Sequence, residues 1–184
     1  YVDGKEVHIH NPYDAVTHGI GYLSEDRKRY GLALGMSVSN NIVMPNLPEY
    51  VSGGIINEKK IEEVAAEYVS KINIKTPTVN QLDKNLYGGN QQKVIIAKWL
   101  LRNSDILIFD EPTRGIDVGA KSEIYKIINK LVEQGKSIIF ISSELPELLR
   151  MSDRVLVMCE GNHTATLDMD EINQNTIMKH ATSH

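Results

Sequence analysis

The chain has 184 residues, of which 41% are hydrophobic and 24% charged, and its formal net charge is −4 at pH 7. This length suits one ordinary domain, and no basic excess supports nucleic-acid binding as the main role. The longest apolar runs are about five residues, far below the roughly 20 residues that a membrane-spanning helix requires. The single cysteine, Cys159, excludes an intramolecular disulfide and is typical of a reducing compartment.

The N-terminal part predicts a short helix and then a strand. In the segment 11–19 (NPYDAVTHG), the asparagine can cap a helix, the proline suits its first turn and the glycine can end it. A strand is expected over 20–24, followed by the charged turn Glu25–Lys28. A charged turn of this kind is either a solvated surface feature or part of a site.

The region 36–84 has the pattern of an inserted helical segment. A first helix is expected over 36–44, ended by Pro45 and Pro48. A second helix is predicted from Glu58, because apolar residues then recur at three- and four-residue steps. Those apolar positions are Ile61, Val64, Ala65, Tyr68, Val69 and Ile72. Core packing explains this stripe as well as docking on a partner does.

The most informative stretch is 86–117, which reads LYGGNQQKVIIAKWLLRNSDILIFDEPTRGID. Gly88, Gly89 and Asn90 open a predicted helix that runs to about Arg102. The N–H groups at a helix start lack partners within the helix and carry partial positive charge, so they suit a phosphate. Glycines let such an anion approach the backbone closely.

An apolar run, 106–109, ends at the acid pair Asp110 and Glu111. A run that is apolar on both faces is typical of a parallel strand covered by helices. A carboxylate at the end of such a strand can hold Mg²⁺, and its neighbour can orient the attacking water. Together with the glycine turn, the pair indicates a nucleotide hydrolase. Two carboxylates in a solvated loop are the simpler alternative.

The remaining elements are a helix over 119–134, strands over 137–142 and 154–158, and a helix within 169–184. Gly135-Lys136-Ser137 imitates the end of a phosphate-binding loop. A lysine, Lys130, stands where that loop needs its first glycine, and the order of helix and strand is reversed. We therefore exclude a phosphate site there.

The ordered set LYGGNQQK, ILIFDEP and TRGID resembles the signature motif, Walker B strand and D-loop of ATP-binding cassette (ABC) transporter ATPases. The GGNQQK form, followed by DEPTRGIDVGAK, is similar to the second cassette of tandem-cassette ATPases of bacterial monosaccharide importers, of the galactose/methyl-galactoside or ribose type. The resemblance implies an α/β fold: a partial P-loop NTPase parallel sheet with an inserted helical subdomain. It divides the chain into a Q-loop region (1–35), the helical subdomain with the signature helix (36–102), and the Walker B, D-loop and switch region (103–184).

The same resemblance implies the site residues. Glu111 and Ser143 would be catalytic, and Asp110 would bind Mg²⁺. Nucleotide-binding residues would be Glu25, Tyr87, Gly88, Gly89, Asn90, Gln91 and Asp117. Glu25, Tyr87 and Ser143 depart from the glutamine, serine and histidine that most cassettes carry at these positions. A phenol at Tyr87 is expected to alter or obstruct the nucleotide site that two cassettes share.

No Walker A sequence, GxxxxGK[ST], occurs in the 184 residues. The chain is therefore expected to be a C-terminal fragment that starts after that loop and binds ATP weakly alone. Family topology puts the Walker A strand between the strands 137–142 and 154–158. Without it, two strand edges would be unpaired, and self-association or local rearrangement is expected there.

The resemblance implies ATP and Mg²⁺ as cofactors, and hydrolysis that energises monosaccharide import. The expected partners are a transmembrane sugar permease, a partner cassette and, indirectly, a periplasmic or extracellular sugar-binding protein. The expected location is peripheral, at the cytoplasmic face of the bacterial inner membrane. One alternative is a degenerate, non-catalytic regulatory or docking cassette. A DNA-maintenance ATPase head is disfavoured by the lack of coiled-coil heptads and by the mild acidity.

Overall fold

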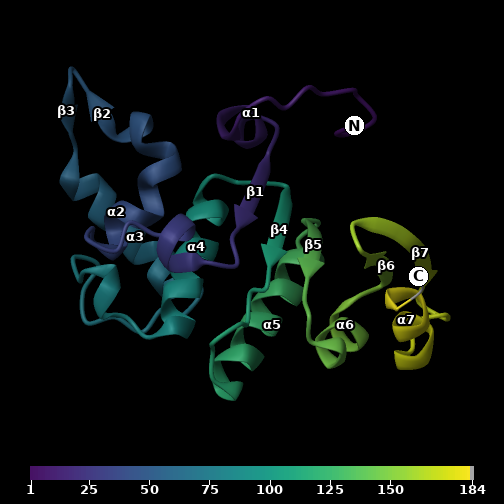
Figure 1. Cartoon of the computed structure of the whole chain (residues 1–184). Helices are drawn as coiled ribbons and strands as arrows, with labels where there is room; N and C mark the ends of the chain where they lie inside the picture. The colour runs from purple at the N-terminus through teal and green to yellow at the C-terminus, as the bar shows by residue number, and fades with distance from the viewer. Residues whose placement is uncertain (183–184) are drawn as a thin grey trace. The chain divides into compact units, whose positions relative to one another are not determined.

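A computed structural model describes residues 1–182. The chain folds as two compact units, Tyr1–Ile139 and Phe140–His184, and each is described here by itself (Figure 1). Within the described residues, no helix is both long and apolar enough to cross a membrane.

The first unit is built on a parallel pair of strands. β1 (Ile20–Leu23) lies beside β4 (Ile106–Asp110), in a register that pairs Ile20 with Ile106 and Leu23 with Phe109. The strand order is β1-β4-β5, where β5 is Ser137–Ile141. Leu23, Leu107 and Phe109 share one face of this pair and are almost wholly buried. Tyr22 on the other face is 48% exposed, so the expectation of strands covered equally on both faces is wrong.

Helices at the ends of these strands start and stop where local signals place them. The side chain of Asn11 caps α1 (Pro12–Thr17) by accepting from the N–H of Asp14 at 3.0 Å. The side chain of Asp117 caps α5 (Val118–Glu133) by accepting from the N–H of Ala120 at 3.0 Å. Gly135 follows the C-cap of α5, and its φ of 84° is the left-handed conformation that glycine adopts freely.

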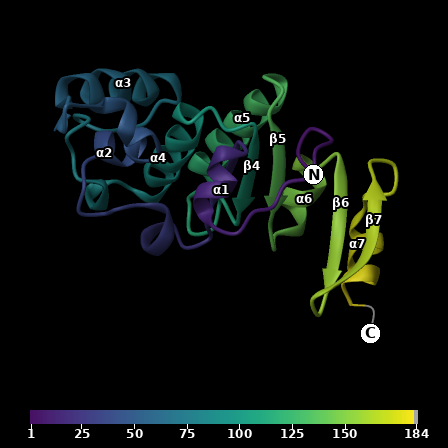
Figure 2. The ribbon, with the colours of Figure 1, turned by 90° about the horizontal axis from the view of Figure 1, so that it is seen from above.

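The predicted inserted segment is helical and lies to one side of the sheet (Figure 2). Its elements are α2 (Val38–Val43), the 3-10 helix η2 (Met44–Tyr50), the hairpin β2–β3 (Val51–Ser52 and Ile55–Ile56), α3 (Glu58–Lys71), the 3-10 turn η3 (Asp83–Asn85) and α4 (Gly88–Leu101). The two prolines end the α-helix as predicted, but the chain then tightens into η2 instead of leaving helical structure. Ile61 and Ala65 of the predicted stripe on α3 are buried, so this stripe packs into a core.

The second unit is a hairpin covered by a helix. β6 (Arg154–Cys159) pairs antiparallel with β7 (Asn162–Asp168) through a turn at Glu160 and Gly161 with φ of 48° and 81°. Its core consists of Val155, Val157, Leu167 and Ile177, the last from α7 (Gln174–Ala181). A further helix, α6, spans Leu145–Met151. The C-terminal helix thus begins five residues later than the predicted segment, and the last two residues of that prediction lie outside the described part.

Strand β7 is absent from the sequence prediction. Its sequence, NHTATLD, contains only alanine and leucine as apolar residues, so period-two hydrophobic alternation is weak. Within residues 1–182, β6 pairs with β7 and β5 is the last strand of its sheet. β5 and β6, the two strands expected to flank the missing one, therefore belong to separate sheets. The self-association expected at their edges stays a prediction.

Candidate nucleotide site

The acid pair lies where the sequence placed it, at the carboxyl end of β4. Asp110 is the last residue of that strand, and Glu111 follows with a φ of 46°, a sparsely populated conformation for a residue with a side chain. Because β1 runs parallel to β4, the carboxyl ends of both strands meet at the same edge of the sheet. Ligand sites of open α/β sheets form at such edges.

The carboxylate of Asp110 is held from the neighbouring strand. The Tyr22 hydroxyl donates to Asp110 Oδ2 at 2.6 Å, and Trp99 Nε1 in turn donates to the Tyr22 carbonyl at 3.0 Å. The hydrogen bond to Asp110 is the main cause that raises the pKa of Tyr22, so the phenol stays a donor at neutral pH. Tyr22 was not predicted as a site residue.

The loop after β4 is tied to the predicted Q-loop region. Glu25 forms an ion pair with Arg114, and Arg27 Nη1 donates to the Arg114 carbonyl at 3.0 Å. The N–H of Arg114 donates to the Glu111 carbonyl at 3.1 Å, which closes the turn after the acid pair. The carboxylate of Glu25 is thus directed by an arginine of this loop, a partner that the sequence did not reveal.

The glycine turn starts α4 as predicted. Gly88 and Gly89 are its first two residues, so their N–H groups lie in the first turn, where no partner exists within a helix. Tyr87 occupies the N-cap position, yet its side chain makes no capping bond and is 88% exposed. The side chain of Tyr87 therefore leaves the N–H groups of the first turn of α4 uncapped, and its phenol stands beside them in solvent.

Packing also explains why positions 88 and 89 are glycines. A Cβ on Gly88 would lie 2.7 Å from Arg27 Nη2, and a Cβ on Gly89 would lie 2.7 Å from the Cβ of Ala120. Such distances are too short for real contacts. The missing side chains therefore let Arg27 reach the turn and let the first turns of α4 and α5 come together.

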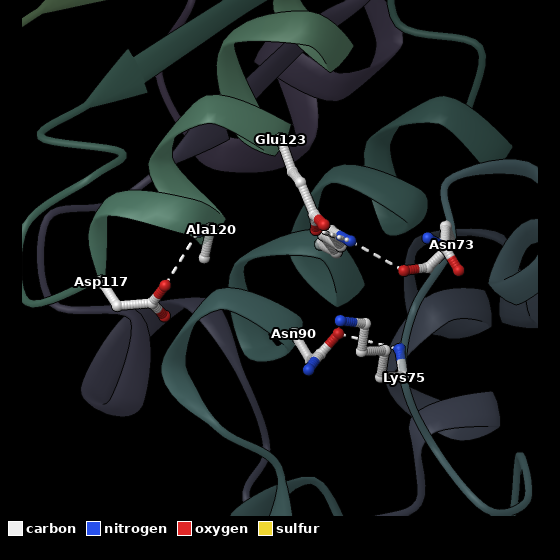
Figure 3. A network of polar contacts seen from close by, with 7 residues as sticks. Asn73, Lys75, Asn90, Asp117, Ala120 and Glu123 are labelled. Atoms are coloured by element: carbon white, nitrogen blue, oxygen red, sulfur yellow. Dashed lines mark hydrogen bonds and ion pairs between the residues drawn. The ribbon is translucent and has the colours of Figure 1, made fainter.

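A cavity of about 320 Å³ lies between the starts of α4 and α5 (Figure 3). The residues that line it are Lys75, Tyr87, Gly89, Asn90, Lys93, Asp117, Gly119, Ala120 and Glu123. The structure thus brings together Tyr87, Gly89, Asn90 and Asp117, four of the predicted nucleotide-binding residues. Lys75, Lys93 and Glu123 are additions that sequence patterns did not single out.

One predicted nucleotide-binding residue, Gln91, has its side chain turned into the protein. Gln91 is 3% exposed, and its Nε2 donates to the Asp83 carbonyl at 3.0 Å. This inward position does not support a contact between the Gln91 side chain and a nucleotide, since packing around Asp83 uses its amide. Ser143 follows β5 in the second unit, and its catalytic role stays a prediction.

Metal binding at this site rests on one carboxylate. Within residues 1–182, no three or more His, Cys, Asp or Glu side chains gather in a way that could hold a metal ion. Mg²⁺ commonly uses one or two carboxylates and takes its other ligands from phosphates and water. Asp110 at the strand end fits that donor set, because Tyr22 bonds to one of its two oxygens.

The parallel sheet, the strand-end acids and the glycine-opened helix together define a nucleotide-binding cassette. The model of the ABC transporter family matches residues 1–114, and the chain belongs to this family. The predicted resemblance is confirmed.

Relatives with high sequence identity are sugar-import proteins by name. The chain is 57% identical over 182 residues to the Burkholderia lata protein named "Putative ribose/galactose/methyl galactoside import ATP-binding protein 1". It is 52% identical over 182 residues to a ribose import ATP-binding protein of Clostridium tetani, and 53% identical over 182 residues to a xylose import ATP-binding protein of Thermoanaerobacter pseudethanolicus. These matches cover 98–99% of this chain but only 36% of each relative's length.

Solved structures confirm the fold class. The dimeric ATP-binding cassette MJ0796, in a post-hydrolysis state bound to ADP and phosphate, matches with a TM-score of 0.69 at 20% identity. The match covers 88% of this chain and 68% of the MJ0796 chain. The α/β fold with a parallel sheet and an inserted helical segment is thus that of an ABC cassette, part of the P-loop NTPase class.

Proposed function

We propose that this chain is part of an ATP-hydrolysing cassette that energises import of a monosaccharide. The observation that carries the proposal is the strand-end carboxylate of Asp110, held by Tyr22 at 2.6 Å on the same unit as a glycine-opened helix start. The names of the relatives support sugar import, since three of them carry ribose, galactose or xylose import in their names.

In this proposal, Asp110 holds Mg²⁺, directly or through water, and Glu111 polarises the water that attacks the γ-phosphate. When bound, Mg²⁺ supplies positive charge next to the β- and γ-phosphates. The φ of 46° at Glu111 places this residue in the left-handed backbone region directly after β4. Ser143, following β5, would hydrogen-bond a phosphate oxygen with its hydroxyl.

The starts of α4 and α5 would act on a nucleotide held by a second cassette. The N–H groups of Gly88 and Gly89 and the carboxamide of Asn90 would contact its terminal phosphate, because all three lie at a positive helix end. Asp117, which caps α5, would face the partner cassette from the same cavity. Glu25 would approach the metal or the water while Arg114 holds its other oxygen.

The functional division would be a Q-loop region (1–35), a helical subdomain with the signature helix (36–102) and a Walker B, D-loop and switch region (103–184). The helical subdomain would dock on a transmembrane sugar permease at the cytoplasmic face of the inner membrane. An external sugar-binding protein would act through that permease. The exposed hairpin residue Ile55, 75% accessible, is one apolar position available for docking.

A chimera tests the proposal. Residues 1–184 replace the matching segment of the Burkholderia lata relative, whose remaining 64% of sequence supplies the rest of the protein. ATP hydrolysis is measured before and after Glu111→Gln. We expect the substitution to lower kcat by about a hundredfold or more, since it removes the group that polarises water.

A non-catalytic regulatory or docking cassette is the second candidate. The 88% exposed Tyr87 at the N-cap of α4 favours it, because a phenol stands at the rim of the cavity where most cassettes have a small hydroxyl. Under that alternative, Glu111→Gln in the chimera leaves hydrolysis unchanged. The same experiment therefore decides between the two functions.

A further inference from the structure

A buried lysine, Lys93, is one of the residues that line the cavity between α4 and α5. Lys93, in the second turn of α4, has a side chain that is 3% exposed. Its Nζ donates to Glu123 Oε2 of α5 at 2.7 Å and to the Asn73 carbonyl at 2.7 Å. A buried ammonium needs a charge partner and hydrogen-bond acceptors, and Lys93 has both.

The acceptor carbonyl belongs to the connector that leaves α3. Asn73 has a φ of 54°, so the chain reverses there and brings the next residues beside the start of α4. Two residues later, the N–H of Lys75 donates to Asn90 Oδ1 at 2.8 Å. Figure 3 shows Asn73 and Lys75 of the connector next to Asn90, with Glu123 above them.

The contact with Lys75 fixes the direction of the Asn90 carboxamide. Because the oxygen accepts from the backbone of Lys75, the amide nitrogen lies on the other side of the group, as Figure 3 shows. A carboxamide has two donors on nitrogen and acceptors only on oxygen. An amide nitrogen that lines this cavity offers donors to an anion, whereas a flipped group would present its oxygen and repel one.

The same lysine also fixes α5. Glu123 lies one and a half turns into α5, whose first turn touches α4 where Gly89 meets Ala120. The hydrogen bond from Lys93 lowers the pKa of Glu123, which keeps its carboxylate charged. Three separate elements, the α3 exit, α4 and α5, thus converge on one ammonium group.

We propose that Lys93 is a positioning residue for phosphate binding at this cavity. It holds the Asn73–Lys75 connector and Glu123 so that the Asn90 amide nitrogen and the start of α5 keep one geometry. This inference rests on the proposed function, since it concerns the same nucleotide. Two of the three donors of the ammonium go to Asn73 and Glu123, so the role assigned to Lys93 is to position these groups.

The test compares Lys93→Met with a matched control, Lys98→Met, in the chimera. Lys98 is also a buried lysine of α4, and its Nζ donates to a backbone carbonyl, that of Gly31, at 2.5 Å. Both substitutions lower the unfolding temperature, since each removes a buried charge from a set of polar partners. Only Lys93→Met is expected to lower kcat, by about tenfold or more, because a small displacement of a positioning group strongly slows a reaction.

Two further measurements distinguish a positioning role of Lys93 from a loss of stability. KM for ATP stays within about twofold in Lys93→Met, since the nucleotide is held mainly by the second cassette before the two close. Lys93→Arg restores most of kcat, because a guanidinium can still bridge a carbonyl and a carboxylate. An equal loss of kcat in Lys93→Met and Lys98→Met would overturn the proposal and indicate a stability effect alone.

Glu123→Gln decides the matter if Lys93→Met fails to fold. The amide keeps an acceptor for Lys93 but removes the charge, and the Glu123 side chain is 41% exposed. We expect kcat to fall about threefold or more, with the exposed residue Glu133 changed to Gln as the control. Unchanged kcat in Glu123→Gln contradicts the proposal. Loss of the Glu111→Gln effect in the parent chimera would instead overturn the proposed function.

Discussion

The Tyr22 hydroxyl and the Asp110 carboxylate, 88 positions apart in the chain, meet at 2.6 Å at the carboxyl edge of the parallel sheet. Tyr22 lies on β1 opposite Ile108, two residues before Asp110 on β4, so both side chains emerge on the same face. This contact links the predicted metal ligand to β1, a strand of the predicted Q-loop region.

Tyr22→Phe tests the role of this contact. The phenyl ring keeps the packing but loses the hydrogen bond to Asp110, so the carboxylate gains freedom. We expect the Mg²⁺ concentration for half-maximal ATP hydrolysis by the chimera to rise about tenfold, as for a lost partner of a metal ligand. Tyr13→Phe is the control, because Tyr13 is an exposed tyrosine of α1. Equal Mg²⁺ dependence in both variants would contradict the role of Tyr22.

Gly89→Ala tests the close approach of α4 and α5. The new Cβ would meet the Cβ of Ala120 at 2.7 Å, so the two helix starts must separate. We expect a loss of about 1–3 kcal/mol in the free energy of unfolding, typical of overpacking, as measured by urea denaturation. Ala120→Gly in the same protein removes the clashing atom and should recover most of the loss. A stable single variant would show that the helices can move apart at little cost.

How far the sequence predicted the fold depended on whether the signal was local. The run 106–109, the Gly88 helix start and the Asp117 cap each carry their signal within a few residues, and all three were predicted. The contacts of Tyr22 and Arg27 span 88 and 87 positions, and no pattern in one sequence reports such pairs.

Buried lysines were missed for a different reason. Lysine is almost always exposed, so a sequence reading places it on the surface. Lys93 and Lys98 are 2% and 7% exposed because backbone carbonyls, at Asn73 and Gly31, accept from their ammonium groups. Those carbonyls come from a left-handed turn and a π-helical segment, Arg27–Gly31, whose positions depend on the folded chain.

The titration of Asp83, which is fully buried in η3, should make the stability of the fold depend on pH. Both of its carboxylate oxygens lack hydrogen-bond partners within the described residues. Burial raises its pKa from 3.8 to about 6, so the folded protein binds a proton more readily than the unfolded chain does. This group therefore makes the fold more stable as pH falls from about 6 towards 4, and less stable above that range.

Asp83→Asn tests the contribution of Asp83 protonation to stability. The amide cannot titrate, so the part of the stability change between pH 4 and pH 6 that comes from this group should vanish, on the order of 1–3 kcal/mol. Urea denaturation of both proteins across that range gives the difference. Burial lowers the pKa of Lys98 to about 8. The titration of Lys98 therefore changes the stability only above the range of pH 4 to pH 6 and does not obscure the result. Parallel pH curves for the two proteins would show that Asp83 does not titrate in the folded state.

Tyr87→Ser tests whether the phenol limits hydrolysis. Tyr87 stands at the N-cap of α4 with its side chain 88% exposed and without a capping bond. Serine is a strongly preferred N-cap, and its hydroxyl can accept from the N–H of the second or third helical residue. We expect the unfolding free energy to rise by about 1 kcal/mol from the new cap.

If the phenol obstructs the approach of a nucleotide held by the second cassette, kcat of the Tyr87→Ser chimera should rise about threefold or more. Tyr87→Ala separates the two effects, because it removes the ring without adding a cap. Unchanged kcat in both variants would show that Tyr87 does not act as a brake, whatever the stability of Tyr87→Ser.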